Sequence, residues 1–124
     1  MKRPGLQLAI EINKRVRASD EWFDEPDELD RVDTALRSIS GMSDPVKAAA
    51  VLAYRVTKSQ GFAEGNKRTA LLLARWILDS NGIDGRRILD PDDRELADLL
   101  VRAASGEDVE ARIIASFLSR AQSL

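Results

Sequence analysis

The sequence predicts an all-α fold, arranged as a compact single-domain bundle of about six helices. In successive segments, apolar residues recur at spacings of three and four, which is the period of an amphipathic helix. Strict alternation of apolar and polar residues, typical of a half-buried strand, nowhere persists over the length of a strand. Proline and glycine divide the chain into segments of helical length. Because 124 residues is the size of one domain, we expect a single domain spanning residues 1–124.

Three of the expected helices begin in the same way, with an acidic residue followed by proline. Proline near the first helical position sacrifices no hydrogen bond, and the acid can cap the helix or oppose its positive end. The three pairs are Glu25-Pro26, Asp44-Pro45 and Asp90-Pro91. They predict helices over residues 26–40, 45–58 and 91–104.

Three further helices complete the bundle. An N-terminal helix is expected over residues 6–17, and a central helix over residues 66–80 is expected to stop at Asn81-Gly82 in the left-handed conformation. Asp108 is expected to cap the last helix, which carries an apolar stripe. Small residues over 48–53 are typical of a helix packed on several neighbours, although the same surface would also accommodate a partner.

The composition excludes several classes of function. The 19 Lys and Arg residues against 21 Asp and Glu give a net charge of −2, so the chain lacks the basic character expected of a nucleic-acid-binding protein. The absence of cysteine and histidine excludes disulfides, zinc-peptidase helices, Ser-His-Asp triads and Cys-His pairs. No apolar run approaches the roughly 20 residues of a membrane span and the N-terminus does not resemble a signal peptide, so we expect a cytoplasmic protein with no membrane partner.

Residues 60–69 carry the pattern that points to chemistry. A glycine-containing loop leads into a long apolar helix that begins with Lys67 and Arg68, against the usual preference for acids in a first helical turn. Unpaired N–H groups in a first turn point at an anion, and Gly65 lets a phosphate approach the backbone closely. This segment therefore predicts a phosphate-binding loop.

The neighbouring side chains refine that prediction. A Walker P-loop does not fit, because Asn66 separates Gly65 from Lys67 and Arg68 stands where the motif needs a hydroxyl. Glu64, an acid among cations, is typical of a carboxylate that holds Mg²⁺ shared with nucleotide phosphates. Asn66 is expected to cap the helix with its amide and to brace the loop. The same residues also fit an ordinary turn with solvated cations.

The segment from Phe62 to Ala70 resembles the signature loop of the Fic/Doc superfamily, His-x-Phe-x-Asp/Glu-Gly/Ala-Asn-Gly/Lys-Arg. Residues 95–99 and 103–107 are similar to the downstream half of the small Doc toxins, so the resemblance covers about residues 26–118. It implies a helical Fic fold and transfer of a phosphate-containing group from a nucleoside triphosphate to a protein hydroxyl. It also implies roles for individual residues: Phe62 anchors the loop, Glu64 holds the metal, Gly65 and Asn66 form an anion hole, and Lys67 and Arg68 bind phosphate.

Two positions favour one branch of that superfamily. Adenylyl-transferring Fic proteins usually have glycine where this chain has Lys67 and a second arginine where it has Leu71. Doc proteins share the Asn-Lys-Arg form and are similar to kinases of a translation elongation factor. The resemblance therefore implies phosphoryl transfer rather than adenylylation, with ATP and Mg²⁺ as cofactors. The implied partners are an antitoxin and a protein substrate such as a translation elongation factor.

Gln60 stands where the superfamily has its catalytic histidine. An amide has no titratable proton acceptor near neutral pH, and loss of a general base typically lowers a rate by roughly 10² to 10⁴. We therefore expect binding to survive and turnover to be largely lost. Three explanations stay open: a substitution made so that a toxic protein can be expressed, a natural variant with altered chemistry, and a natural, catalytically silent binding module.

Two weaker patterns remain. Trp22-Phe23 lies within an acidic run over residues 20–28, which suits either an antitoxin-docking site or core aromatics beside a helix dipole. Arg86-Arg87 follows the central helix and is expected in a solvated turn rather than at a nucleotide.

Overall fold

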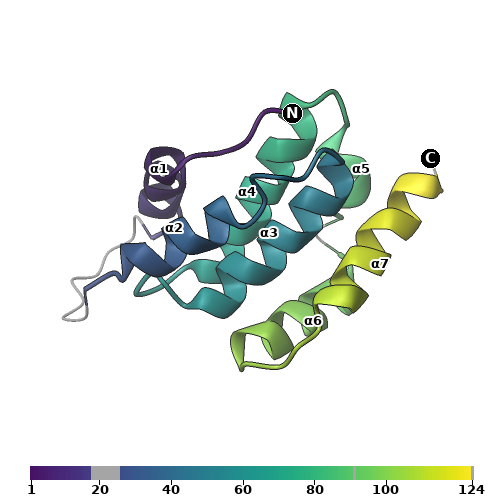
Figure 1. The fold of residues 1–124 in the computed structure, drawn as a ribbon. Helices are drawn as coiled ribbons and strands as arrows, with labels where there is room; N and C mark the ends of the chain where they lie inside the picture. Colours follow the sequence, from purple (N-terminus) through teal and green to yellow (C-terminus); the bar gives the residue numbers. More distant parts are fainter. Residues whose placement is uncertain (18–25, 91, 124) are drawn as a thin grey trace.

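The computed structural model describes residues 1–17, 26–90 and 92–123, and in these ranges it contains seven α-helices and no strand (Figure 1). The all-α class predicted from the sequence is confirmed. The helices are α1 (Leu6–Val16), α2 (Leu29–Arg37), α3 (Pro45–Ser59), α4 (Asn66–Ser80), α5 (Gly85–Ile88), α6 (Arg94–Ala104) and α7 (Glu110–Gln122). The helix that the sequence did not predict is α5, a single turn that contains Arg86-Arg87 and begins where the Asp84 carboxylate accepts from the Arg86 N–H.

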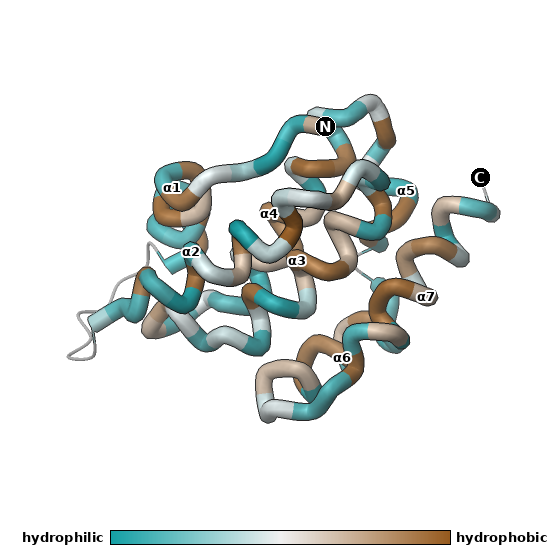
Figure 2. The backbone as a smooth tube through the Cα atoms, in the orientation of Figure 1, coloured by the Kyte–Doolittle hydropathy of each residue, from teal (hydrophilic) through white to brown (hydrophobic). Residues whose placement is uncertain are grey.

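The helices α3 and α4 pack against each other at the centre of the molecule, with α1 and α2 on one side and α6 and α7 on the other (Figure 1). Residues 48–53 of α3 are all buried, so this small-residue stripe is core and not a free docking surface. Along α6 and α7 hydrophobic and hydrophilic residues alternate, as expected of outer amphipathic helices (Figure 2). Arg55 of α3 also donates to Glu110 of α7, and this hydrogen bond raises the pKa of the guanidinium.

One of the three expected acid-proline starts is confirmed. The Asp44 carboxylate accepts from the Val46 N–H at 3.0 Å, and Pro45 is the first residue of α3. The start at Pro26 is wrong, because α2 begins only at Leu29. Asp27 and Glu28 instead bond to the loop before α4, and those tertiary hydrogen bonds outweigh the local preference.

The two C-terminal helices also begin later than expected. Asp90 forms a turn with Asp92 and Asp93, and Asp93 caps α6 by accepting from the Leu96 N–H at 3.1 Å. The N-cap of α7 is Val109, one residue after Asp108. Glu25, Pro91 and the pair Trp22-Phe23 lie outside the described residues.

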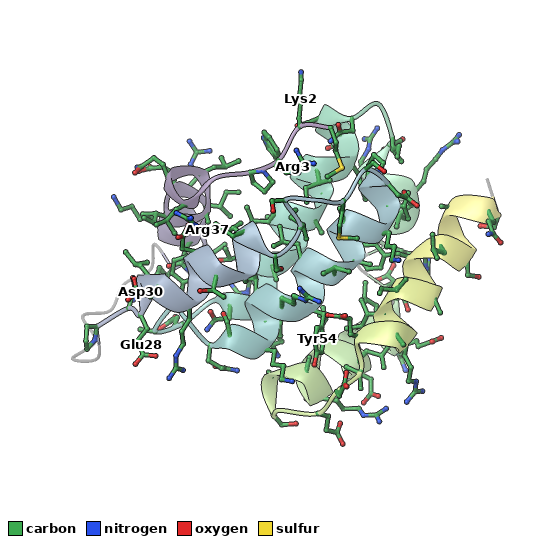
Figure 3. All side chains as sticks on the ribbon, viewed as in Figure 1. Lys2, Arg3, Glu28, Asp30, Arg37 and Tyr54 are labelled. Atoms are coloured by element: carbon green, nitrogen blue, oxygen red, sulfur yellow. The ribbon has the colours of Figure 1, made fainter. Side chains whose placement is uncertain are left out.

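The chain before α1 lies along the C-terminal end of α4. The Lys2 backbone donates to the Asn81 side chain at 2.8 Å, and the Asn81 amide donates back to the Lys2 carbonyl at 3.0 Å. Gly82 follows in the left-handed conformation that was predicted for the helix stop. Figure 3 shows Lys2 at the top of the molecule and Glu28 at the lower left. In the described part of the chain, no helix combines the length and apolar character needed to cross a membrane.

Candidate phosphate-binding site

The sequence-predicted site residues lie in the connection between α3 and α4 and in the first turn of α4. Gln60 ends α3 and Gly65 is the N-cap of α4. The side chains of Glu64, Lys67 and Arg68 are exposed, whereas Phe62 is buried in the core. The loop is thus anchored at its apolar residue and presents its charged residues to solvent.

Asn66 closes the loop into a ring. Its Oδ1 accepts from the Phe62 N–H at 3.0 Å, and its Nδ2 donates to the Phe62 carbonyl at 2.9 Å. The prediction that Asn66 braces the loop is confirmed, but the prediction that it caps α4 is wrong. Both ends of the amide bond to Phe62, and no side chain of the described residues caps this helix.

Segment 26–32 supports the loop from one side. The Glu28 N–H donates to the Gly61 carbonyl at 2.6 Å, and the Ala63 N–H donates to Asp27 Oδ1 at 2.8 Å. A β-carbon on Gly61 would lie 2.5 Å from Val32 Cγ2, so only glycine lets the loop approach α2 this closely.

Helix α1 supports the loop from the other side, through residues that the sequence analysis missed. Asn13 is only 2% exposed, and its Nδ2 donates to the Glu64 carbonyl at 2.9 Å and to Thr69 Oγ1 at 3.1 Å. Arg17 donates to Asn13 Oδ1 at 3.0 Å and pairs with Asp27 at 2.8 Å. The sequence offered one sign of this role. Asn13 is a polar residue four positions after the buried Ala9, on the inner face of an amphipathic helix.

The backbone where α4 begins is left with unpaired donors. The first N–H of this helix with a backbone acceptor belongs to Thr69, which donates to the Gly65 carbonyl at 2.9 Å. Five preceding N–H groups have no acceptor in the described parts of the chain. They belong to Glu64, Gly65, Asn66, Lys67 and Arg68. Consecutive free N–H groups at the positive end of a 15-residue helix are suited to binding an anion.

Two cations flank these donors. Neither Lys67 nor Arg68 forms an ion pair or a hydrogen bond with another described residue, and the first turn of α4 contains no acid. Full positive charge is therefore added to the positive end of a helix dipole without compensation within the described chain. A ligand with several anionic oxygens fits this arrangement best.

Gln60 adopts a left-handed backbone conformation, with φ of 51° and ψ of 34°, and no other described residue besides glycine has positive φ. Its Nε2 donates to the Ala104 carbonyl at 2.9 Å. Because a carbonyl only accepts, the bonded atom must be the amide nitrogen, and Oε1 has no hydrogen-bond partner among the described residues. Gln60 also lines a cleft of about 370 Å³ next to Phe62 and Ala63. There it can orient a hydroxyl but cannot take its proton.

Glu64 fits a metal shared with a ligand rather than a metal centre built from protein alone. Its carboxylate forms no ion pair with a described residue, and the described chain contains no cluster of three or more acids that could enclose an ion. Mg²⁺ at nucleotide sites is typically held by one or two carboxylates together with phosphate oxygens and water. One exposed carboxylate beside a phosphate-binding loop is sufficient for that arrangement.

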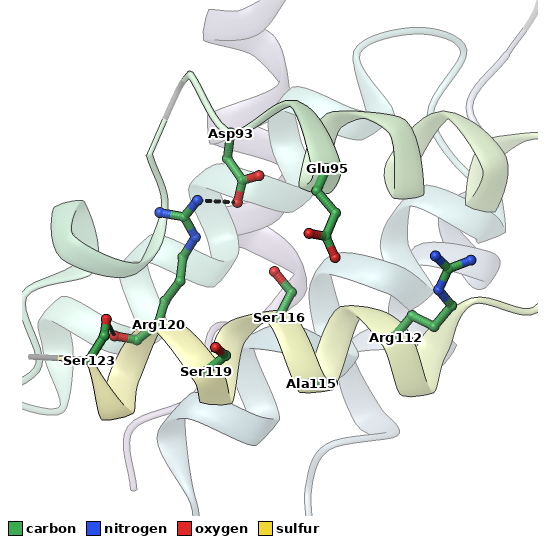
Figure 4. Close-up of a pocket in the computed structure, with 8 residues that line it drawn as sticks. All are labelled: Asp93, Glu95, Arg112, Ala115, Ser116, Ser119, Arg120 and Ser123. Atoms are coloured by element: carbon green, nitrogen blue, oxygen red, sulfur yellow. Dashed lines mark hydrogen bonds and ion pairs between the residues drawn. The ribbon is translucent and has the colours of Figure 1, made fainter.

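A larger hollow lies elsewhere, between α6 and α7, with a volume of about 530 Å³ (Figure 4). Arg120 on one wall pairs with Asp93 at 2.8 Å, so its charge is already compensated. The remaining lining is mostly serine together with Glu95 and Arg112. None of the predicted site residues lines this hollow.

Comparison with known families supports the predicted fold and loop. The sequence model of the Fic/DOC family matches residues 3–78, which is more than half of the chain. The chain belongs to the Fic/DOC family. The match includes α1, α2, α3, the loop and most of α4, so the supporting residues on α1 lie within the family region, ahead of the segment where the sequence resemblance began. No curated protein matches the chain.

Proposed function

We propose that this Fic/DOC protein is the toxin of a toxin-antitoxin pair and that its fold serves phosphoryl transfer from ATP to a hydroxyl of a target protein. The observation that carries this proposal is the start of α4, where free N–H groups meet Lys67 and Arg68 without any acid in the first turn. Such a site suits a triphosphate because several anionic oxygens can use these donors at once.

The residues have distinct roles in this proposal. The N–H groups from Glu64 to Arg68 and the two cations neutralise the phosphates, and Glu64 holds Mg²⁺ against them. Bound Mg²⁺ supplies charge neutralisation for the leaving diphosphate. The target hydroxyl oxygen bonds to the γ-phosphorus while the bond from that phosphorus to the bridging oxygen breaks, and the nucleoside diphosphate leaves. The hydroxyl proton passes to solvent, because exposed Gln60 can accept a hydrogen bond from the hydroxyl but cannot take its proton.

The choice of phosphoryl transfer over adenylylation rests on Lys67 and Leu71. These residues depart from the adenylyl-transferring pattern, so phosphoryl transfer is favoured over adenylylation. The similarity of this pattern to Doc makes a translation elongation factor the preferred substrate, acting in the cytoplasm where ATP is available. An antitoxin encoded next to the gene would bind near the loop and hold the toxin inactive.

Binding is tested first by titrating the protein with ATP and Mg²⁺ in a calorimeter. Lys67→Ala with Arg68→Ala should abolish binding, because the two uncompensated cations are removed. The matched control is Lys47→Ala with Arg94→Ala, which removes two exposed first-turn cations from helices whose N-termini are capped by Asp44 and Asp93. Equal ATP affinity of the Lys67/Arg68 variant and the unaltered chain would reject the site.

Turnover is tested by Gln60→His, with Gln60→Ala as the control. Histidine supplies the missing proton acceptor, so labelled phosphate from ATP should appear on a protein of a bacterial lysate, and induction of the variant should arrest growth. The rate is expected to exceed that of the unaltered chain by roughly 10² to 10⁴. Labelling by the Gln60 form would instead indicate altered natural chemistry.

The alternative function is a catalytically silent module that binds a nucleotide or a partner. It is favoured by the fixed amide of Gln60, which has no proton acceptor to offer. This alternative is supported if neither the unaltered chain nor the Gln60→His variant labels any protein with ATP or another triphosphate, and neither is toxic.

The antitoxin is tested by co-expressing the chain with the neighbouring reading frame, followed by size-exclusion chromatography. Failure of the two proteins to co-elute at micromolar concentration counts against the antitoxin.

A further inference from the structure

We infer that Asn13 of α1 is a positioning residue for the anion site: it fixes the orientation of the Glu64–Gly65 peptide so that the Gly65 N–H faces the ligand. The inference rests on the proposed function in one respect, namely that the anion is the triphosphate. The geometry that supports it is independent of the ligand's identity.

The orientation of the Asn13 amide is set by its partners. Arg17 can only donate a hydrogen bond, so the atom 3.0 Å from its Nη1 must be the Asn13 oxygen. The amide nitrogen must therefore face the Glu64 carbonyl at 2.9 Å and Thr69 Oγ1 at 3.1 Å. Both N–H bonds of the amide are then used, and the buried side chain has no unsatisfied atom.

The bond to the Glu64 carbonyl determines where the next N–H points. The described chain contains no cis peptide bond, and in a trans peptide the C=O and N–H of one unit point in opposite directions. Because the Glu64 oxygen faces α1, the Gly65 N–H faces away from α1. It has no acceptor in the described chain, and it lies beside the other free donors where α4 begins.

The reversed orientation of this peptide would be costly. It would point the Gly65 N–H at the amide N–H of Asn13 and leave the Glu64 carbonyl among the donors intended for the anion. There is little room for other adjustments, because a β-carbon on Gly65 would lie 2.9 Å from Val16 Cγ1 and 3.2 Å from Asn13 Nδ2. α1 thus holds the loop in the orientation that binds an anion.

Arg17, the residue that follows α1, helps to hold the loop at a second point. Arg17, which bonds to Asn13, also pairs with Asp27, and Asp27 Oδ1 accepts from the Ala63 N–H at 2.8 Å. This contact fixes the peptide between Phe62 and Ala63, whose carbonyl is bound by Asn66 on its opposite side. Asn13 and Asp27 therefore fix two peptides of the loop, and Arg17 bonds to both side chains.

The first test compares Asn13→Asp with Thr69→Val. Asn13→Asp keeps an oxygen for Arg17 but places a second acceptor against the Glu64 carbonyl, so it should weaken the binding of ATP with Mg²⁺, and of inorganic phosphate, by about tenfold or more. Thr69→Val removes the other partner of Asn13 in the same buried place and leaves the bond to Glu64 intact. Its affinity should stay within about twofold of the unaltered chain. Asn13→Ala replaces Asn13→Asp if the charged variant does not fold.

The second measurement separates positioning from general stability. In ¹H–¹⁵N spectra recorded without ligand, Asn13→Asp should move the Gly65 and Glu64 amide signals and leave that of Leu73 in the core unchanged. Unaltered affinity together with an unmoved Gly65 signal would overturn the inference. If the unaltered chain binds no ATP, the proposed function fails, and the Gly65 signal alone then decides the role of Asn13.

Discussion

The two central helices, α3 and α4, each have 15 residues and pack against each other, yet they begin in opposite ways. α3 begins with Pro45 and is capped by the neighbouring Asp44, so its first turn is satisfied by adjacent sequence. α4 begins after Gly65 in a left-handed conformation with φ of 78°, has no side-chain cap from the described parts of the chain and places cations in its first turn. A helix start that its own sequence leaves unsatisfied has N–H donors available for a ligand.

The two starts are also supported differently. The start of α3 needs no residue from elsewhere, whereas the loop before α4 is held by Asn13, Asp27 and Glu28, all more than 30 positions away in sequence. These bonds fix peptides of the loop and leave the N–H groups from Glu64 to Arg68 without an acceptor in the described chain. The donors are therefore arranged before any ligand arrives, which is what preorganised electrostatic stabilisation requires.

Of the three substitutions that test this comparison, Gly61→Ala is expected to change the free energy of unfolding most. The added carbon would meet Val32 and the Glu28 carbonyl, so the loop must move and the free energy of unfolding should fall by about 1–3 kcal/mol. Gly41→Ala is the control, because a β-carbon there has no neighbour within 4 Å. Urea unfolding measures both variants, and equal midpoints would contradict the close approach of loop and α2.

Asp44→Ala is expected to cause an intermediate loss of stability. Loss of the cap leaves the Val46 N–H without its acceptor and should lower the free energy of unfolding by about 1 kcal/mol. ATP affinity should be unchanged, because the start of α3 is not part of the site. Urea unfolding and calorimetry on the same preparation test both statements, and a loss of affinity would show that the two helix starts are coupled.

Lys67→Glu is expected to cause the smallest change in the free energy of unfolding, and it should stabilise the protein rather than destabilise it. Replacing a cation by an acid in the first turn of α4 should raise the free energy of unfolding by about 0.3–1 kcal/mol and at the same time weaken ATP binding. The part of the gain that comes from the glutamate charge should be lost below about pH 4, where glutamate is protonated, and the part that comes from removing the lysine charge should remain. A destabilised variant at neutral pH would mean that the positive charge at this position is already compensated.

The sequence predicted most of the helices and the loop because both depend on local patterns. Apolar spacing located α1, α3 and α4, and Gly65, Lys67 and Arg68 marked the helix start as unusual. The start of α2 was misplaced because Asp27 and Glu28 bond to a loop more than 30 residues away, and no local rule contains that partner. Asn13 was missed for the same reason. Asn66 was wrongly predicted to cap α4, because its amide instead bonds to both the N–H and the carbonyl of Phe62.

The pairing of Lys2 with Asn81 has a practical consequence for attaching anything ahead of Lys2. The attachment point lies at the C-terminal end of α4, and 15 residues at 1.5 Å each place it about 22 Å from the loop along the helix. An extended linker would need at least about seven residues to cover that distance. A fluorophore or surface anchor on a shorter linker would stay clear of the loop before α4, whereas a longer linker would raise the effective concentration of the attached group at that loop.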